Sequence, residues 1–256
     1  MYTIQNNFGR NHQRMNTLAD HGNQQLDTVD RLAYEMSQQS YLAPDKRKQY
    51  VQNYQYDPEL SNTDTAIYHN HATKKTHVSN RGSSSAYDWA VSDAQIALGA
   101  EGYGSRFKRV VDQTNKAHGK YNYNVSTSGH SLGGQASSYT TEKLGDQDWY
   151  EGGVGINPGV SSVGRGNYFS KQRRACRSKT NKPAYCDKQK SLVEEGDYVS
   201  GRNIACGYIT LGLGGKMCRK KGYGNTTYYK HNNERNYTRP GKLLRNFRNH
   251  SLDNFK

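Results

Sequence analysis

Aliphatic and phenylalanine side chains are scarce in this sequence. Leucine, isoleucine, valine and phenylalanine together make up 37 of the 256 residues. That is about 14%, below the roughly 20% at which disorder is expected of a highly charged chain. The 21 tyrosines partly compensate, because a tyrosine can bury its ring and still hydrogen-bond through its hydroxyl. We therefore expect an ordered central domain with polar margins.

Several signals for particular classes of protein are also missing. The four cysteines form no Cys-x-x-Cys pair, which argues against a structural zinc site, and we expect neither a metal nor a cofactor. No apolar run approaches the roughly 18 residues of a membrane span. Residues 1–14 contain no apolar core of a signal peptide. These absences favour a cytoplasmic or particle-associated protein whose cysteines are free thiols by default, although one or two disulfides stay open.

Positive charge is abundant, since 36 basic residues exceed 22 acidic ones and give a net charge of +14. Such a surface favours peripheral contact with an anionic membrane, with nucleic acid or with an acidic protein. A basic protein without a specific polyanion partner is the plain alternative. No zinc finger, helix-turn-helix or RNA-binding signature accompanies the charge, so no motif supports nucleic acid as a partner. The oligomeric state is left open.

The hydrophobic periodicity predicts alternating helices and strands over the middle of the chain. We expect a polar arm over 1–24 and a single domain over 25–256, with a helical N-terminal segment at 25–60 and a basic insertion of low structure at 161–190. Alternation of this kind predicts an α/β fold with a mostly parallel central sheet. The expected helices span about 25–40, 45–53, 86–98, 106–118 and 135–144, and the expected strands 65–69, 75–80, 123–128, 153–157, 191–195 and 205–211.

A Gly-x-Ser-x-Gly motif carries the main chemical signal. Gly129-His130-Ser131-Leu132-Gly133 follows a predicted strand and precedes a predicted helix. This context is that of a nucleophile elbow, in which a serine stands at a sharp strand-to-helix turn and the two glycines let strand and helix approach closely. The alternative is an ordinary glycine-rich turn. The context favours Ser131 as a nucleophile.

Two segments resemble the class 3 (fungal-type) lipases. The first is Asn124–Ala136, which contains the elbow. The second is Thr76–Trp89, which contains Arg81-Gly82-Ser83 and Asp88-Trp89 and is followed by Asp93. The resemblance covers roughly 60–160, and 190–256 more loosely. It implies an α/β-hydrolase fold and a Ser-Asp-His triad in that chain order. It also implies an oxyanion hole built from Ser83 and from the backbone N–H of Leu132.

The acid and the base of the triad are selected by their position in the chain. Asp197 follows a predicted strand and a glycine, as the acid of the resembled family does, whereas a surface turn is its plain alternative. Two histidines follow Asp197, namely His231 and His250. We favour His250, because His250-Ser-Leu-Asp-Asn-Phe resembles the C-terminal histidine segment of the family. Its alternative is a frayed residue near the chain end.

These features predict a serine ester hydrolase of the lipase, phospholipase or esterase type that acts on a lipid or small ester through an acyl-enzyme. The region of the expected lid, residues 94–104, is short and only mildly apolar, which disfavours interfacial activation on neutral fat. A basic surface suits anionic phospholipid better. The alternative function is a hydrolase-fold structural or polyanion-binding protein, for example a virion component, with little or no activity.

Overall fold

The structure is a computed structural model. It describes residues 26–82, 105–158, 172, 174–176, 178, 180–194 and 225–229. The predicted arm over 1–24, the predicted helix over 86–98 and the predicted strand over 205–211 lie outside these residues.

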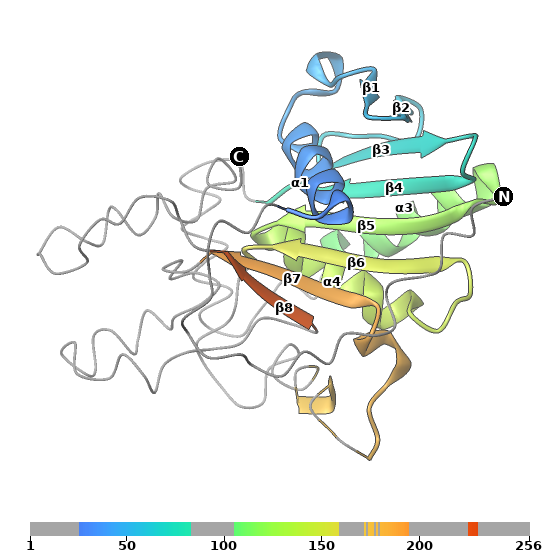
Figure 1. Cartoon of the computed structure of the whole chain (residues 1–256). Coiled ribbons are helices and arrows are strands. Elements are labelled where there is room, and N and C mark those ends of the chain that lie inside the picture. Colours follow the sequence, from blue (N-terminus) through green and yellow to red (C-terminus); the bar gives the residue numbers. More distant parts are fainter. Residues whose placement is uncertain are drawn as a thin grey trace, which may run out of the picture.

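An eight-stranded sheet forms the centre of the molecule, with its strands in sequence order from β1 to β8 (Figure 1). Strands β1 to β4 pair antiparallel, and strands β4 to β8 pair parallel. The α/β fold with a mostly parallel central sheet, predicted from the sequence, is confirmed in this arrangement. The strands are Tyr50–Val51, Tyr54–Tyr56, Thr65–Asn70, Lys75–Asn80, Asn124–His130, Tyr150–Ile156, Gln189–Glu194 and Asn225–Tyr229.

Helices cover both faces of the sheet. Helix α1 (Thr28–Ser40) crosses one face, while α3 (Ser105–Tyr121) and α4 (Leu132–Leu144) lie behind the other (Figure 1). Neighbouring residues of β5 show this directly, because successive strand side chains point to opposite faces. The Ser128 hydroxyl lies 3.0 Å from that of Ser37 in α1, and the Thr127 hydroxyl lies 2.8 Å from that of Ser137 in α4.

Helix α1 begins where the sequence predicts a helix start. The Asp27 side chain caps it by accepting a hydrogen bond from the Asp30 N–H at 2.8 Å. The Lys190 ammonium of β7 lies 2.6 Å from the buried Asp30 carboxylate and thereby ties the first turn of α1 to the sheet.

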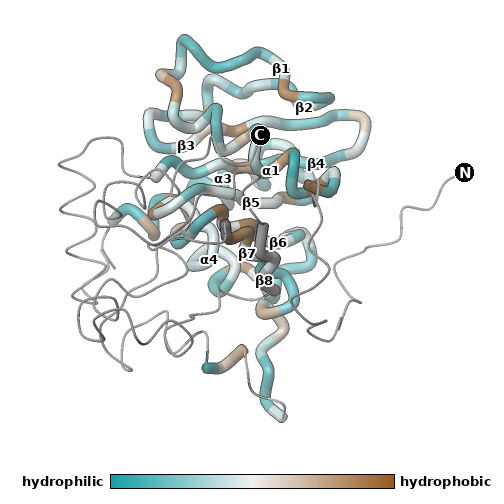
Figure 2. The backbone as a smooth tube through the Cα atoms, turned by 60° about the vertical axis from the view of Figure 1, so that its left-hand side comes forward, coloured by the Kyte–Doolittle hydropathy of each residue, from teal (hydrophilic) through white to brown (hydrophobic). Residues whose placement is uncertain are grey.

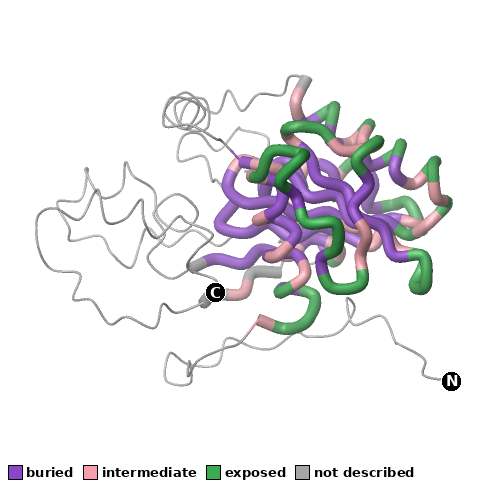
Figure 3. Tube along the Cα trace, turned by 90° about the horizontal axis from the view of Figure 1, so that it is seen from above, coloured by how far each residue is buried: buried purple, intermediate pink, exposed green. Residues whose placement is uncertain are grey.

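The core contains many polar side chains, as the scarcity of aliphatic residues requires. Most of the described backbone is hydrophilic or neutral, with apolar stretches that are short (Figure 2), yet the central strands are buried (Figure 3). Buried tyrosines supply volume and remain hydrogen-bonded. The Tyr150 hydroxyl lies 2.7 Å from that of Thr127 and 2.9 Å from that of Thr141, which meets the requirement that buried polar atoms find partners.

The helical segment predicted over 25–60 is correct only in part. The predicted helix at 45–53 is wrong, since a 3-10 turn at Pro44–Lys46 is followed by strands β1 and β2. These two strands pair as Val51 with Tyr54 across a tight turn in which Gln52 has a φ of 49°. Alternating tyrosines that pack on one face stabilise a strand, and here they outweigh the helical spacing.

The insertion predicted to have low structure is ordered toward its end. A disulfide joins Cys176 to Cys186, and Ala184–Cys186 forms a 3-10 turn before β7 begins at Gln189. The expectation of free thiols is therefore wrong for this pair. Strand β8, Asn225–Tyr229, was not predicted either, because its polar surroundings mask a short threonine- and tyrosine-rich run.

Candidate active site

Ser131 stands at the junction between β5, which ends at His130, and α4, which begins at Leu132. Its backbone has φ 57° and ψ −121°, a conformation that costs a non-glycine residue about 1–3 kcal/mol. The Ser131 N–H donates to the Ile156 carbonyl at the end of β6, at 3.0 Å. The strand-to-helix elbow predicted from the motif is thus present, and its strain is the kind held at functional sites.

The two glycines of the motif are required by close packing. A Cβ atom on Gly129 would overlap the backbone of Gly133, and a Cβ atom on Gly133 would overlap the backbone carbonyl of Asn80. Asn80 ends β4, the parallel neighbour of β5. The end of β4 is therefore packed against the first turn of α4, directly beside Ser131.

The first turn of α4 supplies backbone N–H groups next to Ser131. The first N–H groups of a helix have no partner within the helix, and the helix dipole makes this end attractive to negative charge. The Leu132 side chain packs against the cluster of Phe107, Val110 and Ala136, so it turns away into the protein. The Leu132 side chain is therefore occupied by packing, and the role of its N–H in an oxyanion hole stays a prediction.

Gly82 lies against the elbow from the other side. A Cβ atom built on Gly82 would stand 2.7 Å from the His130 carbonyl oxygen and 3.2 Å from the Ser131 Cβ. Ser83, the predicted second oxyanion donor, is the next residue in the chain and lies outside the described part. The chain therefore approaches Ser131 at Gly82, the residue that precedes the predicted donor.

The Tyr41 side chain contacts both Gly82 and His130, the residue before Ser131. Its hydroxyl oxygen accepts the Gly82 N–H at 3.2 Å and lies 2.8 Å from His130 Nδ1. Burial raises the pKa of the Tyr41 hydroxyl to about 12, so that this hydroxyl is neutral at physiological pH. The sequence analysis did not find Tyr41, because a tyrosine just after a helix carries no signal of a contact with residues 41 and 89 positions away.

Arg106, in the first turn of α3, holds the backbone of Arg81 and Gly82. The Arg106 guanidinium donates to the carbonyls of Arg81 at 2.5 Å and of Gly82 at 3.3 Å. Arg81 in turn forms an ion pair of 2.9 Å with Asp64. Burial lowers the pKa of Arg106, although arginine stays charged at physiological pH.

Asp197 and His250, the predicted acid and base, lie outside the described residues. Strand β7 ends at Glu194, three residues before Asp197 in the sequence. Strand β8 ends at Tyr229, two residues before the alternative base His231, which also lies outside the described residues.

Within the described part of the chain, no helix has both the length and the apolar character needed to cross a membrane.

Comparisons with known proteins give a structural resemblance. No protein-family model matches the sequence, and no curated protein sequence is found to be related. Similar solved structures include a lipase from Yarrowia lipolytica, which is 13% identical over 81% of each chain with a TM-score of 0.46. They also include a triacylglyceride lipase from Rhizomucor miehei, 13% identical over 80% of this chain and 82% of that one, with a TM-score of 0.46. A triacylglycerol lipase from Penicillium expansum is 13% identical over 81% of this chain and 82% of that one, with a TM-score of 0.41.

Proposed function

We propose that this protein is a serine ester hydrolase that cleaves acyl esters through an acyl-enzyme formed on Ser131. The observation that carries the proposal is the backbone of Ser131, held at φ 57° and ψ −121° between β5 and the first turn of α4. A protein gains nothing for stability from this strain, and a hydrolase needs it to project the serine hydroxyl toward the substrate.

The proposed reaction has two halves. A histidine accepts the Ser131 proton as the oxygen attacks the ester carbonyl, and Asp197 orients that histidine and stabilises its charged form. The N–H of Leu132, together with Ser83, stabilises the negative oxygen of the tetrahedral intermediate. The histidine then protonates the leaving alcohol, and water releases the acid. His250 is the base favoured by the sequence resemblance, and His231 is its competitor.

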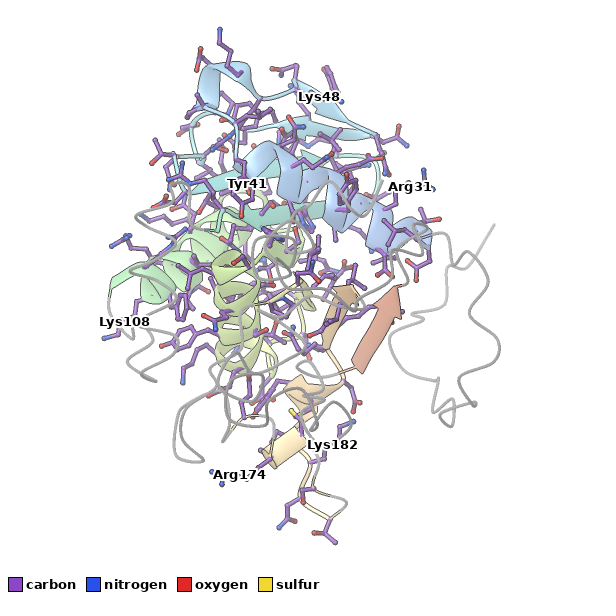
Figure 4. The ribbon with its side chains drawn as sticks, turned by 90° about the vertical axis from the view of Figure 1, so that its left-hand side faces the viewer. Arg31, Tyr41, Lys48, Lys108, Arg174 and Lys182 are labelled. Carbon is purple, nitrogen blue, oxygen red and sulfur yellow. A yellow bond between two sulfur atoms is a disulfide. The ribbon has the colours of Figure 1, made fainter. Side chains whose placement is uncertain are left out.

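Lipid esters, and anionic phospholipids in particular, are the proposed substrate class. The net charge of +14 would concentrate the protein at an anionic membrane surface. Described lysine and arginine side chains such as Lys108, Arg174 and Lys182 project from the periphery of the molecule (Figure 4). The short, mildly apolar segment 94–104 is a reason to prefer such a surface over neutral fat.

Hydrolysis of p-nitrophenyl butyrate and of anionic phospholipid vesicles tests the proposal. Wild type should hydrolyse both, and Ser131→Ala should lose about 10⁴-fold or more in kcat. Ser178→Ala, which alters a serine far along the chain in the disulfide-bonded segment, serves as the control and should retain activity. Equal background rates for wild type and Ser131→Ala would refute the proposal, and tight salt-sensitive vesicle or DNA binding without hydrolysis would then support the polyanion-binding alternative.

The same assay decides the base. Asp197→Asn, His231→Gln and His250→Gln are measured side by side, and only one of the two histidine variants should fall to the level of Ser131→Ala. A fluorophosphonate probe, which labels an activated serine, should modify Ser131 in wild type. It should fail to modify Ser131 in the histidine variant that has lost activity.

A further inference from the structure

We propose that Tyr41 and Arg106 are positioning residues that hold the Gly82 peptide against the elbow and thereby set the geometry of the oxyanion site. This inference rests on the proposed function. It adds that helices α1 and α3, which contribute no residue to the triad, determine how well the intermediate is stabilised.

The Tyr41 hydroxyl makes two contacts. A hydroxyl has one proton to donate and two lone pairs that accept. The Gly82 N–H, at 3.2 Å, occupies one lone pair. The hydroxyl keeps its proton and its second lone pair for the contact with His130 Nδ1 at 2.8 Å, in which the tautomer of the imidazole sets the direction. The Tyr41 hydroxyl thus contacts both His130, the residue before Ser131, and Gly82, the residue before Ser83.

Arg106 holds the other side of the same residue. Its guanidinium donates to the Gly82 carbonyl at 3.3 Å and to the Arg81 carbonyl at 2.5 Å. The N–H and the C=O of Gly82 are therefore both fixed, one by Tyr41 and one by Arg106. With both groups held, the described backbone is fixed up to the residue that precedes the predicted donor Ser83.

The packing leaves room only for glycine at this position. A Cβ atom on Gly82 would overlap the Tyr41 hydroxyl and would stand 2.7 Å from the His130 carbonyl oxygen. Oxyanion donors act when they lie within hydrogen-bonding distance of the developing charge, and displacements of about 1 Å lower the rate by about 100-fold. The distance from the proposed donors to the developing charge therefore depends on the close approach of Gly82 to the elbow.

Tyr41 is itself anchored independently of Gly82. It caps α1 at its C-terminal end, where its N–H donates to the Gln38 carbonyl and the N–H of the following Leu42 donates to the Gln39 carbonyl. The same helix is bonded to β5 through Ser128, whose hydroxyl lies 3.0 Å from that of Ser37. Figure 4 shows Tyr41 at the end of α1, within the body of the molecule. A hydroxyl held in place in this way can fix the position of the Gly82 N–H that it accepts.

The central experiment compares Tyr41→Phe and Arg106→Gln with wild type. Each should lower kcat for p-nitrophenyl butyrate by about 10- to 100-fold with KM changed less than twofold, because the loss falls on the transition state. Affinity for an alkyl boronate, which mimics the tetrahedral intermediate, should fall in parallel with kcat. Arg106→Lys, which retains one charged donor, should recover part of the loss. Tyr68→Phe is the matched control, since it removes a buried tyrosine hydroxyl that bonds to the Lys48 carbonyl in a different part of the protein.

A second readout does not depend on activity. The Gly82 amide should exchange its hydrogen with solvent faster in Tyr41→Phe, while the amides of β5 remain protected. Normal kcat and boronate affinity in both variants would overturn the inference, and so would a loss confined to KM or one matched by Tyr68→Phe. Inactive wild type would instead refute the proposed function. In that case an unchanged exchange rate of the Gly82 amide in Tyr41→Phe would also refute the proposed hold of Tyr41 on Gly82. A faster exchange rate would support that hold as a structural contact.

Discussion

Gly133 lies against the carbonyl oxygen of Asn80, so closely that a single methyl group on Gly133 would overlap it. The two residues are 53 positions apart in the sequence, and they belong to the first turn of α4 and to the end of β4. Their contact brings the end of β4, and with it Arg81 and Gly82, to the side of Ser131. The close approach of the Gly133 and Asn80 backbones therefore places Gly82 beside Ser131.

Gly133→Ala should destabilise the protein and abolish hydrolysis. The atoms that a new Cβ would meet belong to the backbone of Asn80 and Arg81, which cannot move aside without shifting β4. Overpacking of this kind costs about 3 kcal/mol in the free energy of unfolding, which urea denaturation measures. Gly119→Ala in α3 is the control, because nothing lies within 4 Å of its added Cβ, and it should stabilise the protein by about 0.5–1 kcal/mol. Equal effects of the two variants would contradict the packing argument.

Ser131→Gly should be more stable than Ser131→Ala, although both should be inactive. Both substitutions remove the hydroxyl, but only glycine accepts φ 57° and ψ −121° without strain. The difference in the free energy of unfolding should be roughly 1 kcal/mol in favour of glycine. Thermal or urea denaturation of the two variants provides the measurement. If alanine were as stable as glycine at this position, the elbow would carry no strain.

Acid should weaken the fold through His77. Its imidazole nitrogens lie 2.8 Å from the hydroxyls of Ser126 and Ser128, and burial lowers its pKa from 6.5 to about 4. Between these pH values the unfolded chain binds a proton that the folded chain does not, so the free energy of unfolding falls as the pH drops below about 6.5. The total loss should be on the order of 3 kcal/mol by pH 4, and it should flatten below that pH for this group.

The variant His77→Gln isolates that contribution. Its free energy of unfolding should depend less on pH between 6.5 and 4 than that of wild type. An unchanged pH slope in His77→Gln would show that other groups cause the acid sensitivity.

Lys190→Met should be strongly destabilising. Lys190 lies 2.6 Å from Asp30, whose side chain is 1% exposed, and its removal would leave a buried carboxylate without its cation. Such a loss costs about 3–5 kcal/mol, and Asp30→Asn in the same chain should restore part of it. Lys143→Met, at an ion pair of 3.4 Å with a lysine side chain 43% exposed, should change stability by less than about 1 kcal/mol. Similar losses at both lysines in urea denaturation would argue against a special role for the buried pair.

Local patterns predicted the elements around Ser131 well. The helix predicted over about 25–40, the strands predicted at 65–69 and 75–80 and the strand-turn-helix around the elbow all carry short-range signals, namely hydrophobic periodicity and paired glycines. Predictions failed where the signal was weak, as at β8, or where short strands imitate helical spacing, as at β1 and β2. Asp197, His250 and Ser83 stay predictions, with His231 as the alternative base.

The sequence by itself determined that Ser131 stands in a sharp strand-to-helix elbow, because the strand, the two glycines and the helix that make the elbow are neighbours in the chain. Only the tertiary structure decided what surrounds that serine. The contacts of Tyr41 with Gly82 and His130, and of Arg106 with Gly82, join segments between 24 and 89 residues apart. Such contacts arise when the sheet brings α1, β4 and α3 to the carboxyl end of β5, and no local pattern of residue types encodes that distance.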